Sequence, residues 1–148
     1  MIGPIEAFMT EDHARLDALL RASSGGDDEP YRAFRGGLLR HIAMEEKVLL
    51  PFARRERGGA PLEIAAQLRA DHSRIARLLV QTPTRGSIDE LCAVLARHNA
   101  IEEGSDGLYA VCDALAAEGA NALVDRLRAQ PAVPVAPYYD GPLVRLVK

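Results

Sequence analysis

The segments His41-Ile42-Ala43-Met44-Glu45-Glu46 and His98-Asn99-Ala100-Ile101-Glu102-Glu103 share one pattern, a histidine followed four residues later by two glutamates. The other two histidines stand in matched frames, Asp12-His13-Ala14-Arg15-Leu16 and Asp71-His72-Ser73-Arg74-Ile75. All four histidines of the chain therefore fit a duplicated order, in which a single histidine precedes each HxxxEE segment. We interpret this order as two copies of a helix hairpin that together form a carboxylate-bridged metal site.

The composition favours a single all-α domain. A chain of 148 residues with 48% hydrophobic side chains can bury a sizeable core and is not typical of disordered proteins. Aromatic residues make up only 5% of the chain and tryptophan is absent, whereas Ala, Leu and Arg are abundant, which favours helix over sheet. The net charge is -3 with both signs interleaved, so no basic block indicates nucleic-acid binding. No apolar run is long enough to span a membrane.

The first residues and the cysteines indicate the cytoplasm. The N-terminal segment lacks the positive region and long apolar run of a signal peptide. Cys92 and Cys112 are expected on one helix, where 20 residues would separate them by roughly 30 Å, too far for a disulfide. A helix break between them would weaken this argument.

The apolar spacing predicts an antiparallel up-down-up-down four-helix bundle. Hydrophobic residues at three- and four-residue intervals predict helices over 4–21, 28–57 and 61–81, and a fourth that opens at a capping box, Ser87-Ile88-Asp89-Glu90. Pro51 should kink the second helix, and Gly104-Ser105-Asp106-Gly107 should break the fourth. Helix should resume over 108–115, and a short extra helix is expected over 120–129.

We place the bundle in residues 1–130 and a Pro-rich C-terminal tail in residues 131–148. The tail holds four of the nine prolines, yet Val133, Val135, Tyr138, Tyr139, Leu143, Val144 and Leu146 make it too apolar for a solvated linker. We predict that it packs on the bundle or on a partner subunit, which makes a homodimer one alternative.

The four histidines should meet at one level of such a bundle. His13 lies about 13 Å of helix before the first connection, and His41 lies roughly 16 Å after it. The corresponding distances for His72 and His98 are about 13 Å and 15 Å. Residues of antiparallel neighbours meet when these heights agree, so the spacing brings the four side chains together.

The HxxxE spacing then adds the carboxylates. Residues four apart lie on one helix face, so each such helix offers an imidazole to one metal and a carboxylate that reaches between two. A single HxxxE pair is common on helix surfaces and would be weak evidence. Here every histidine fits one duplicated pattern, and six buried ionisable groups without a metal would be very costly. Imidazole and carboxylate ligands suit iron, manganese or zinc.

These residues resemble the hemerythrin-like (HHE cation-binding) domain family. The likeness covers about Pro4 to Leu115 and rests on Asp12-His13 with Leu16, His41-x-x-x-Glu45-Glu46 with Leu50-Pro51, Asp71-His72, and His98-x-x-x-Glu102-Glu103 with Leu108-Tyr109. The resemblance implies a four-helix bundle with two non-haem iron ions, oxo- or hydroxo- and carboxylate-bridged. It implies that His13, His41, His72 and His98 are metal ligands and that Glu45 and Glu102 bridge. Manganese and zinc are the alternative metals.

One departure from the family pattern bears on function. Hemerythrins that carry oxygen reversibly use a fifth histidine one turn from the third-helix ligand, where this chain has Leu68 and Ala76. The site should therefore be more symmetric and have an extra open position. Tyr31, Tyr109, Tyr138 and Tyr139 are the tyrosines that could fill it, although a structural hydroxyl is the expected role for each. Glu46 and Glu103 are expected as flanking carboxylates, with orientation of ligand histidines as the alternative. Asp12 and Asp71 could hydrogen-bond near the site, but a place on the solvated helix surface is expected at least as much.

Four functions are compatible with this site. The preferred one is a module that binds or senses O2 or a related small oxidant, such as peroxide or NO. The second is a di-iron enzyme of peroxide or NO detoxification. The third is iron storage, delivery or iron-centre repair, and the fourth is a structural zinc or metal-free bundle.

Overall fold

The computed structural model describes residues 2–142, and helices form the regular structure of this range. The long helices are α1 (Pro4–Ala22), α2 (Glu29–Met44), α4 (Ala65–Val80) and α5 (Arg85–Glu103). The shorter elements are a π-helical turn η1 (Glu45–Leu49), α3 (Leu50–Glu56), α6 (Leu108–Ala116), a 3-10 turn η2 (Ala117–Gly119) and α7 (Ala120–Arg128). The prediction of an all-α fold is confirmed for the described residues. Among these helices, none is both long and apolar enough to cross a bilayer.

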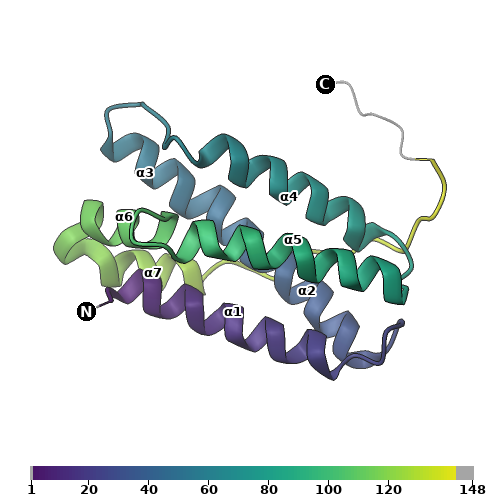
Figure 1. Cartoon of the computed structure of the whole chain (residues 1–148). Coiled ribbons are helices and arrows are strands. Elements are labelled where there is room, and N and C mark those ends of the chain that lie inside the picture. Colours follow the sequence, from purple (N-terminus) through teal and green to yellow (C-terminus); the bar gives the residue numbers. More distant parts are fainter. Residues whose placement is uncertain (1, 143–148) are drawn as a thin grey trace.

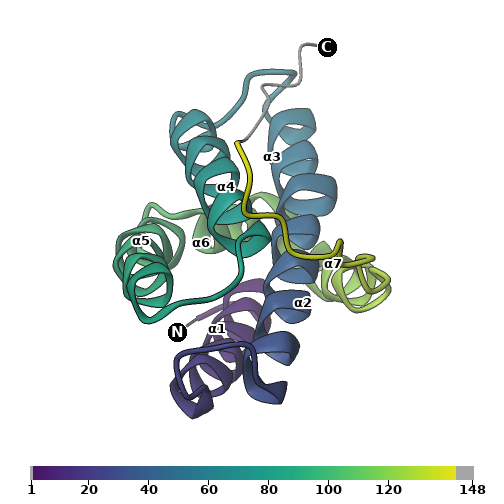
Figure 2. The same cartoon turned by 90° about the vertical axis from the view of Figure 1, so that its right-hand side faces the viewer.

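The long helices form a bundle around a common interior (Figures 1 and 2). Helix α1 contacts α2 and α5, and α4 contacts the same two helices, so the four close into a ring. Helices α6 and α7 pack at the end of the bundle that holds the N-terminus, where both contact α1. The predicted break after Glu103 and the short extra helix are both present.

The core consists of two apolar clusters with a polar layer between them. One cluster lies at the end of α3, α6 and α7 and includes Met9, Leu49 and Leu68. The other lies toward the α1–α2 connection and includes Leu16 and Leu38. In that cluster α1 and α2 approach closely at Gly37, where a Cβ atom would lie 2.8 Å from Leu16 Cδ2. The two clusters therefore pack on either side of a buried polar layer, here called the histidine layer, which contains His13, His41, His72 and His98.

Two predicted helix starts are wrong. Helix α4 begins at Ala65 instead of Pro61, because the Arg57 guanidinium donates to the Pro61 carbonyl and holds that residue in the connecting loop. Helix α5 begins three residues earlier than expected, because Thr84 caps it in place of Ser87. The Thr84 hydroxyl accepts from the Ser87 N–H (3.1 Å), and the Ser87 hydroxyl accepts from the Thr84 N–H (2.9 Å).

The irregularity expected at Pro51 is a π-helical turn just before it. Proline has no N–H to donate and its ring would clash with the carbonyl four residues back. The Leu50 N–H donates to the Glu45 carbonyl, five residues back, so the chain remains helical through this point. The turn begins at Glu45, which links this local distortion to the histidine layer.

The described part of the tail lies on the bundle. The Tyr139 N–H donates to the Val80 carbonyl (2.8 Å), and Asp140 accepts from the Thr82 N–H (2.9 Å). The Tyr138 hydroxyl donates to Asp27 (2.8 Å). Leu143, Val144 and Leu146 lie outside the described residues, and packing on a partner subunit stays a prediction.

Candidate metal centre

The six predicted ligands come together in the buried polar layer. The histidines come from α1, α2, α4 and α5, and the two glutamates come from η1 and α5. None of the six is more than 8% exposed, and both glutamates are fully buried (His13, His41, Glu45, His72, His98, Glu102). Helical spacing explains the pairs His41–Glu45 and His98–Glu102, since residues four apart share one face.

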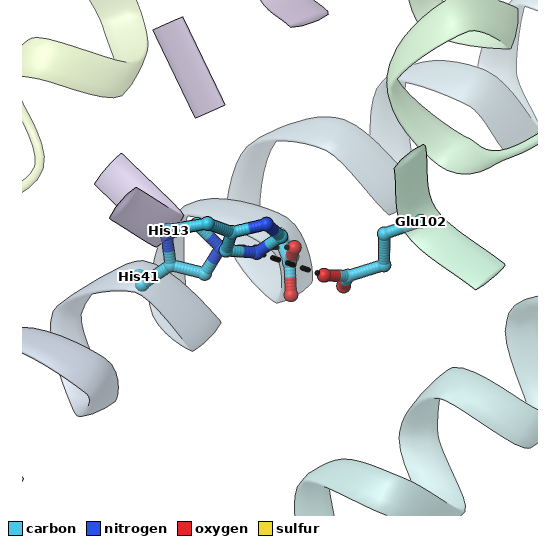
Figure 3. A group of neighbouring side chains, drawn as sticks. His13, His41 and Glu102 are labelled. Carbon is cyan, nitrogen blue, oxygen red and sulfur yellow. Dashed lines mark ion pairs between the residues drawn. The ribbon is translucent and has the colours of Figure 1, made fainter. Parts of the chain in front are cut away.

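The first group consists of His13, His41, Glu45 and Glu102, which offer ligand atoms within 4.8 Å of one another. His13 Nε2 lies 3.2 Å from Glu102 Oε1, and His41 Nε2 lies 3.3 Å from Glu45 Oε2. The centroids of the two imidazole rings are 4.6 Å apart. Figure 3 shows both rings side by side with the Glu102 carboxylate pointing toward them. These four side chains could hold a metal ion.

The second group consists of His72, His98 and the same two glutamates, again within 4.8 Å of one another. His72 Nε2 lies 2.9 Å from Glu45 Oε1, and His98 Nε2 lies 2.9 Å from Glu102 Oε2. The ring centroids are 4.9 Å apart. These four side chains could hold a second metal ion.

The two carboxylates divide their oxygens between the groups. Glu45 directs Oε2 toward His41 of the first group and Oε1 toward His72 of the second. Glu102 directs Oε1 toward His13 and Oε2 toward His98. Each glutamate is therefore placed to bridge two cations, one on either side of it.

One atom of the centre lacks a hydrogen-bond partner among the described residues. Glu102 Oε2 is buried and unpartnered, although it lies 2.9 Å from His98 Nε2 and 3.9 Å from His72 Nε2. A buried carboxylate oxygen without a partner is costly. A cation bound by this oxygen and the two Nε2 atoms would satisfy all three, so the donor set fits a metal.

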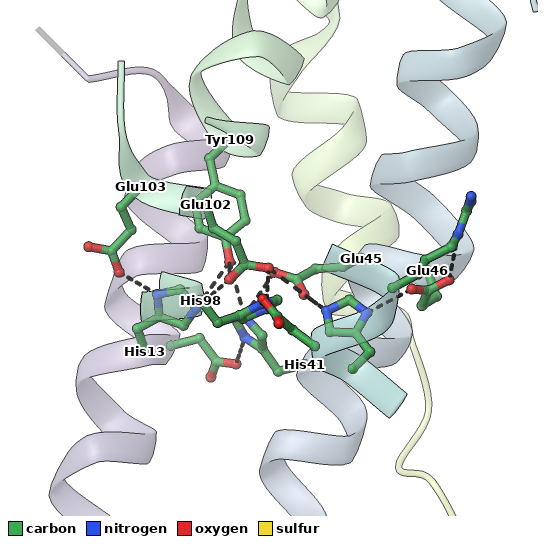
Figure 4. A network of polar contacts seen from close by, with 12 residues as sticks. His13, His41, Glu45, Glu46, His98, Glu102, Glu103 and Tyr109 are labelled. Carbon is green, nitrogen blue, oxygen red and sulfur yellow. Dashed lines mark hydrogen bonds and ion pairs between the residues drawn. The ribbon is translucent and has the colours of Figure 1, made fainter. Parts of the chain in front are cut away.

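Each imidazole is also held at its far side by a carboxylate that contacts Nδ1. The four pairs are Asp12 with His41 (2.7 Å), Glu46 with His72 (2.7 Å), Asp71 with His98 (3.0 Å) and Glu103 with His13. Figure 4 shows this network around the centre. The proton at Nδ1 is thereby fixed on the carboxylate side, which leaves Nε2 of each ring facing the interior as the ligand atom.

The expectation for these four carboxylates was therefore incomplete. Glu46 and Glu103 are not merely flanking groups, and Asp12 and Asp71 are only 12% and 13% exposed. The repeated Asp-His and Glu-Glu pairs in the sequence were the signal for this role. Sequence could not give the partners, because each carboxylate holds a histidine on another helix.

Removal of one supporting carboxylate is expected to weaken one metal position. For Asp12→Ala, we expect metal affinity at the first group to fall by about 10–100-fold, as is usual when a partner of a ligand histidine is lost. Competition with a chromophoric chelator would measure both affinities. The neighbouring surface substitution Glu11→Ala is the matched control. Equal affinities in wild type and Asp12→Ala would contradict the orienting role.

A further side chain of the centre is Tyr109 from α6. Its hydroxyl lies 2.5 Å from Glu45 Oε2, 2.9 Å from Glu102 Oε1, 3.0 Å from His13 Nε2 and 3.1 Å from His41 Nε2. Tyr109 was one of four tyrosines considered for an open ligand position, but a structural hydroxyl was the expected role. The other three lie elsewhere. The hydroxyls of Tyr138 and Tyr139 donate to Asp27 and to the Pro142 carbonyl, and the buried hydroxyl of Tyr31 has no hydrogen-bond partner in the described part of the chain.

Gly107 allows Tyr109 to reach the centre. A Cβ atom at this position would lie 2.4 Å from the Glu102 carbonyl oxygen and 2.5 Å from that of Ile101. Only glycine permits the chain to turn back so closely over the end of α5. The break that ends α5 therefore also carries Tyr109 over the two glutamates.

Burial and opposite charges shift the pKa values of the centre in the metal-free protein. Burial lowers the pKa of His41, but Glu45 and Asp12 outweigh it and raise the value to about 10. Burial also lowers the pKa of His72, but the surrounding carboxylates outweigh this effect and raise the value to about 10. Burial would raise the pKa of Glu102, whereas contacts with Glu45 and three histidines hold it well below its usual range. Without metal, protons on the imidazoles balance the buried carboxylates.

Metal uptake at neutral pH is expected to release protons. His41 and His72 have folded pKa values of about 10, above the ordinary value of 6.5, so both are protonated at pH 7 in the metal-free protein. A metal binds the neutral imidazole, so each of these rings must lose a proton and the apparent affinity should rise with pH up to about 10. Calorimetry in buffers of different ionisation enthalpy would measure the release. Binding heats that do not vary with the buffer would contradict it.

The two cysteines take no part in this centre. Cys92 is exposed on α5 and Cys112 is buried on α6, and both are free. The expectation that they share one helix was wrong, because the segment from Gly104 to Gly107 separates the two helices.

Comparisons with known proteins supply no relative: no protein-family model, no curated protein and no solved structure matches the chain.

Proposed function

We propose that this chain is a hemerythrin-like antiparallel four-helix bundle whose centre holds two iron ions and binds or senses O2 or a related small oxidant, such as peroxide or NO. The observation that carries the proposal is the division of each bridging carboxylate between two histidine pairs. Two nitrogens and two shared oxygens at each position suit a divalent or trivalent transition metal.

We assign iron to this centre because iron would let it bind and react with small oxidants. When bound, a reduced pair of iron ions supplies electrons and an open position to O2, NO or peroxide. The chain's own residues hold and orient the donors and keep bulk water away, since none of the six is more than 8% exposed. Manganese or zinc would use the same donors, so metal analysis must decide between them.

A cavity of about 130 Å³ supports a small, largely apolar ligand. It lies between α1, α2 and α5 and is lined mainly by apolar side chains (Leu16, Leu20, Phe34, Leu38, Leu95). Its lining includes exposed Asp17, Cys92 and Ala96 as well as buried His13. The cavity is therefore lined both by surface residues and by a predicted ligand of the first group, and its volume is too small for a large substrate.

Closure of this cavity is expected to slow the reaction with O2. In Ala96→Trp, the indole replaces a small exposed side chain at the cavity, so we expect a several-fold lower rate with unchanged metal content. Stopped-flow absorption after reduced protein is mixed with O2 would measure the rate. Ala93→Trp, also exposed on α5 but outside the cavity lining, is the control. If both variants react at the wild-type rate, the cavity is not the access route.

One observation favours a di-iron enzyme of peroxide or NO detoxification as the second candidate. A phenol side chain, that of Tyr109, lies within the centre, with its hydroxyl 2.5 Å from Glu45 Oε2. Glu46 and Glu103 contact the Nδ1 atoms of His72 and His13 at the far side of the imidazole rings. Catalytic turnover of peroxide or NO would distinguish this enzyme from a module that binds its ligand stoichiometrically.

Iron storage or delivery is less well supported. Burial of all six side chains favours retention of the metal over its release. The cytoplasm remains the predicted compartment and a homodimer through the tail remains a prediction. Size-exclusion chromatography of the full chain and of a chain that ends at Gln130 would test the dimer.

The deciding experiment is metal analysis with absorption spectroscopy. Protein purified without oxygen should hold about two irons per chain, as a two-metal bundle site requires, and should develop a new visible band in air. Reversal of the band under vacuum would favour a carrier or sensor over oxidase-like chemistry. A single zinc or no metal, without spectral response after iron reconstitution, would overturn the proposal.

A further inference from the structure

The Tyr109 hydroxyl lies within 3.1 Å of the ligand atom of every member of the first group. Two donors bound at right angles to one cation, with bonds of about 2.1 Å, lie about 3.0 Å apart. The four separations, from 2.5 to 3.1 Å, are therefore near those expected between a fifth donor and four neighbouring donors of the same cation. In Figure 4 the tyrosine reaches into the network from α6, apart from the helices that carry the histidines.

Among residues 2–142, no hydroxyl oxygen contacts the histidines of the second group in this way. The two HxxxEE segments are related by repetition, and Tyr109 stands seven residues after Glu102. Seven residues after Glu45, the first copy has Phe52, which has no hydroxyl and packs in the apolar cluster. The two metal positions therefore differ although their histidines and glutamates are equivalent.

We propose that Tyr109 is a fifth protein ligand of the cation held by His13, His41, Glu45 and Glu102, bound through its phenolate oxygen. When the metal–oxygen bond forms, the phenol O–H bond breaks and its proton leaves to solvent; no electron is transferred. The position of His72 and His98 keeps only four protein donors and is the more open of the two to a small ligand. This inference rests on the proposed metal-binding function.

In the metal-free protein the proton of the Tyr109 hydroxyl lies between the carboxylates of Glu45 and Glu102. The hydroxyl donates to Glu45 Oε2 at 2.5 Å. A cation at this place would replace the proton as the positive partner of the same oxygens.

Spectroscopy of the metal-loaded full chain would test this ligand directly. Fe(III)-loaded wild type should show a visible phenolate-to-iron band, with tyrosinate ring modes in resonance Raman spectra excited within it. Zn(II) loading should produce a tyrosinate ultraviolet difference spectrum. Tyr109→Phe should abolish all three signals. Tyr31→Phe is the matched control and should retain them, because Tyr31 is equally buried and its hydroxyl has no hydrogen-bond partner within residues 2–142.

The outcomes separate this inference from the proposed function. Two metals per wild-type chain without any tyrosinate signal would overturn the Tyr109 ligand and leave the metal centre intact. Signals that persist in Tyr109→Phe would assign them to another tyrosine and also overturn it. Absence of bound metal in wild type would overturn the proposed function itself. The Raman measurement needs only wild type, so a folding defect of the variant would not obscure the result.

Discussion

Replacement of Glu102 by glutamine is expected to remove both metal ions, because this one carboxylate serves both groups. Its Oε1 lies 3.2 Å from His13 Nε2 and its Oε2 lies 2.9 Å from His98 Nε2. Glutamine keeps the shape of the side chain but loses the charge and turns one oxygen into an N–H donor. Loss of a partner of a ligand histidine alone costs about 10–100-fold in metal affinity, so loss of a bridging ligand should cost more than about 100-fold.

Metal content per chain after gel filtration would measure this effect. We expect about two metals in wild type, as a two-metal bundle site requires, and well below one in Glu102→Gln. The surface substitution Glu90→Gln, at a side chain that is 51% exposed, is the control and should retain both ions. Two tightly bound metals in Glu102→Gln would contradict the bridging role.

Removal of the metals is expected to cause the largest loss of stability. A cation present at about 1,000 times its dissociation constant stabilises the folded state by about 4 kcal/mol, so two would contribute about 8 kcal/mol. For chains of about this size, 1 kcal/mol shifts the melting temperature by about 2–4 °C, which predicts a decrease of roughly 15–30 °C. The reason is mass action: the cations bind the six side chains that the folded chain holds together in its interior, and the unfolded chain has no such site.

Differential scanning calorimetry before and after chelation would measure the decrease. Readdition of the metal should restore the wild-type melting temperature, whereas Glu102→Gln should melt at one temperature with or without chelator. Equal melting temperatures of the loaded and the stripped wild type would show that the metals do not stabilise the fold. Circular dichroism would report in the same experiment whether the stripped chain stays helical.

The sequence alone determined the helical fold and the six side chains at its centre. Four-residue spacing within a helix is fixed by the backbone, so His41 with Glu45 and His98 with Glu102 had to share a face. The rise per residue also set the heights of His13 and His72 relative to the connections. These features depend only on distances along the chain, and the structure brings all six side chains together as expected.

Only the tertiary structure decided which groups support or complete the centre. Asp12 adjoins His13 in sequence but contacts His41, and Glu103 follows Glu102 but contacts His13 on α1. Tyr109 reaches the first group because Gly107 lets the chain turn back over the end of α5, and nothing in the spacing of a single helix predicts that return. Such contacts join separate helices, so their geometry depends on how the helices pack and not on the local period of the sequence.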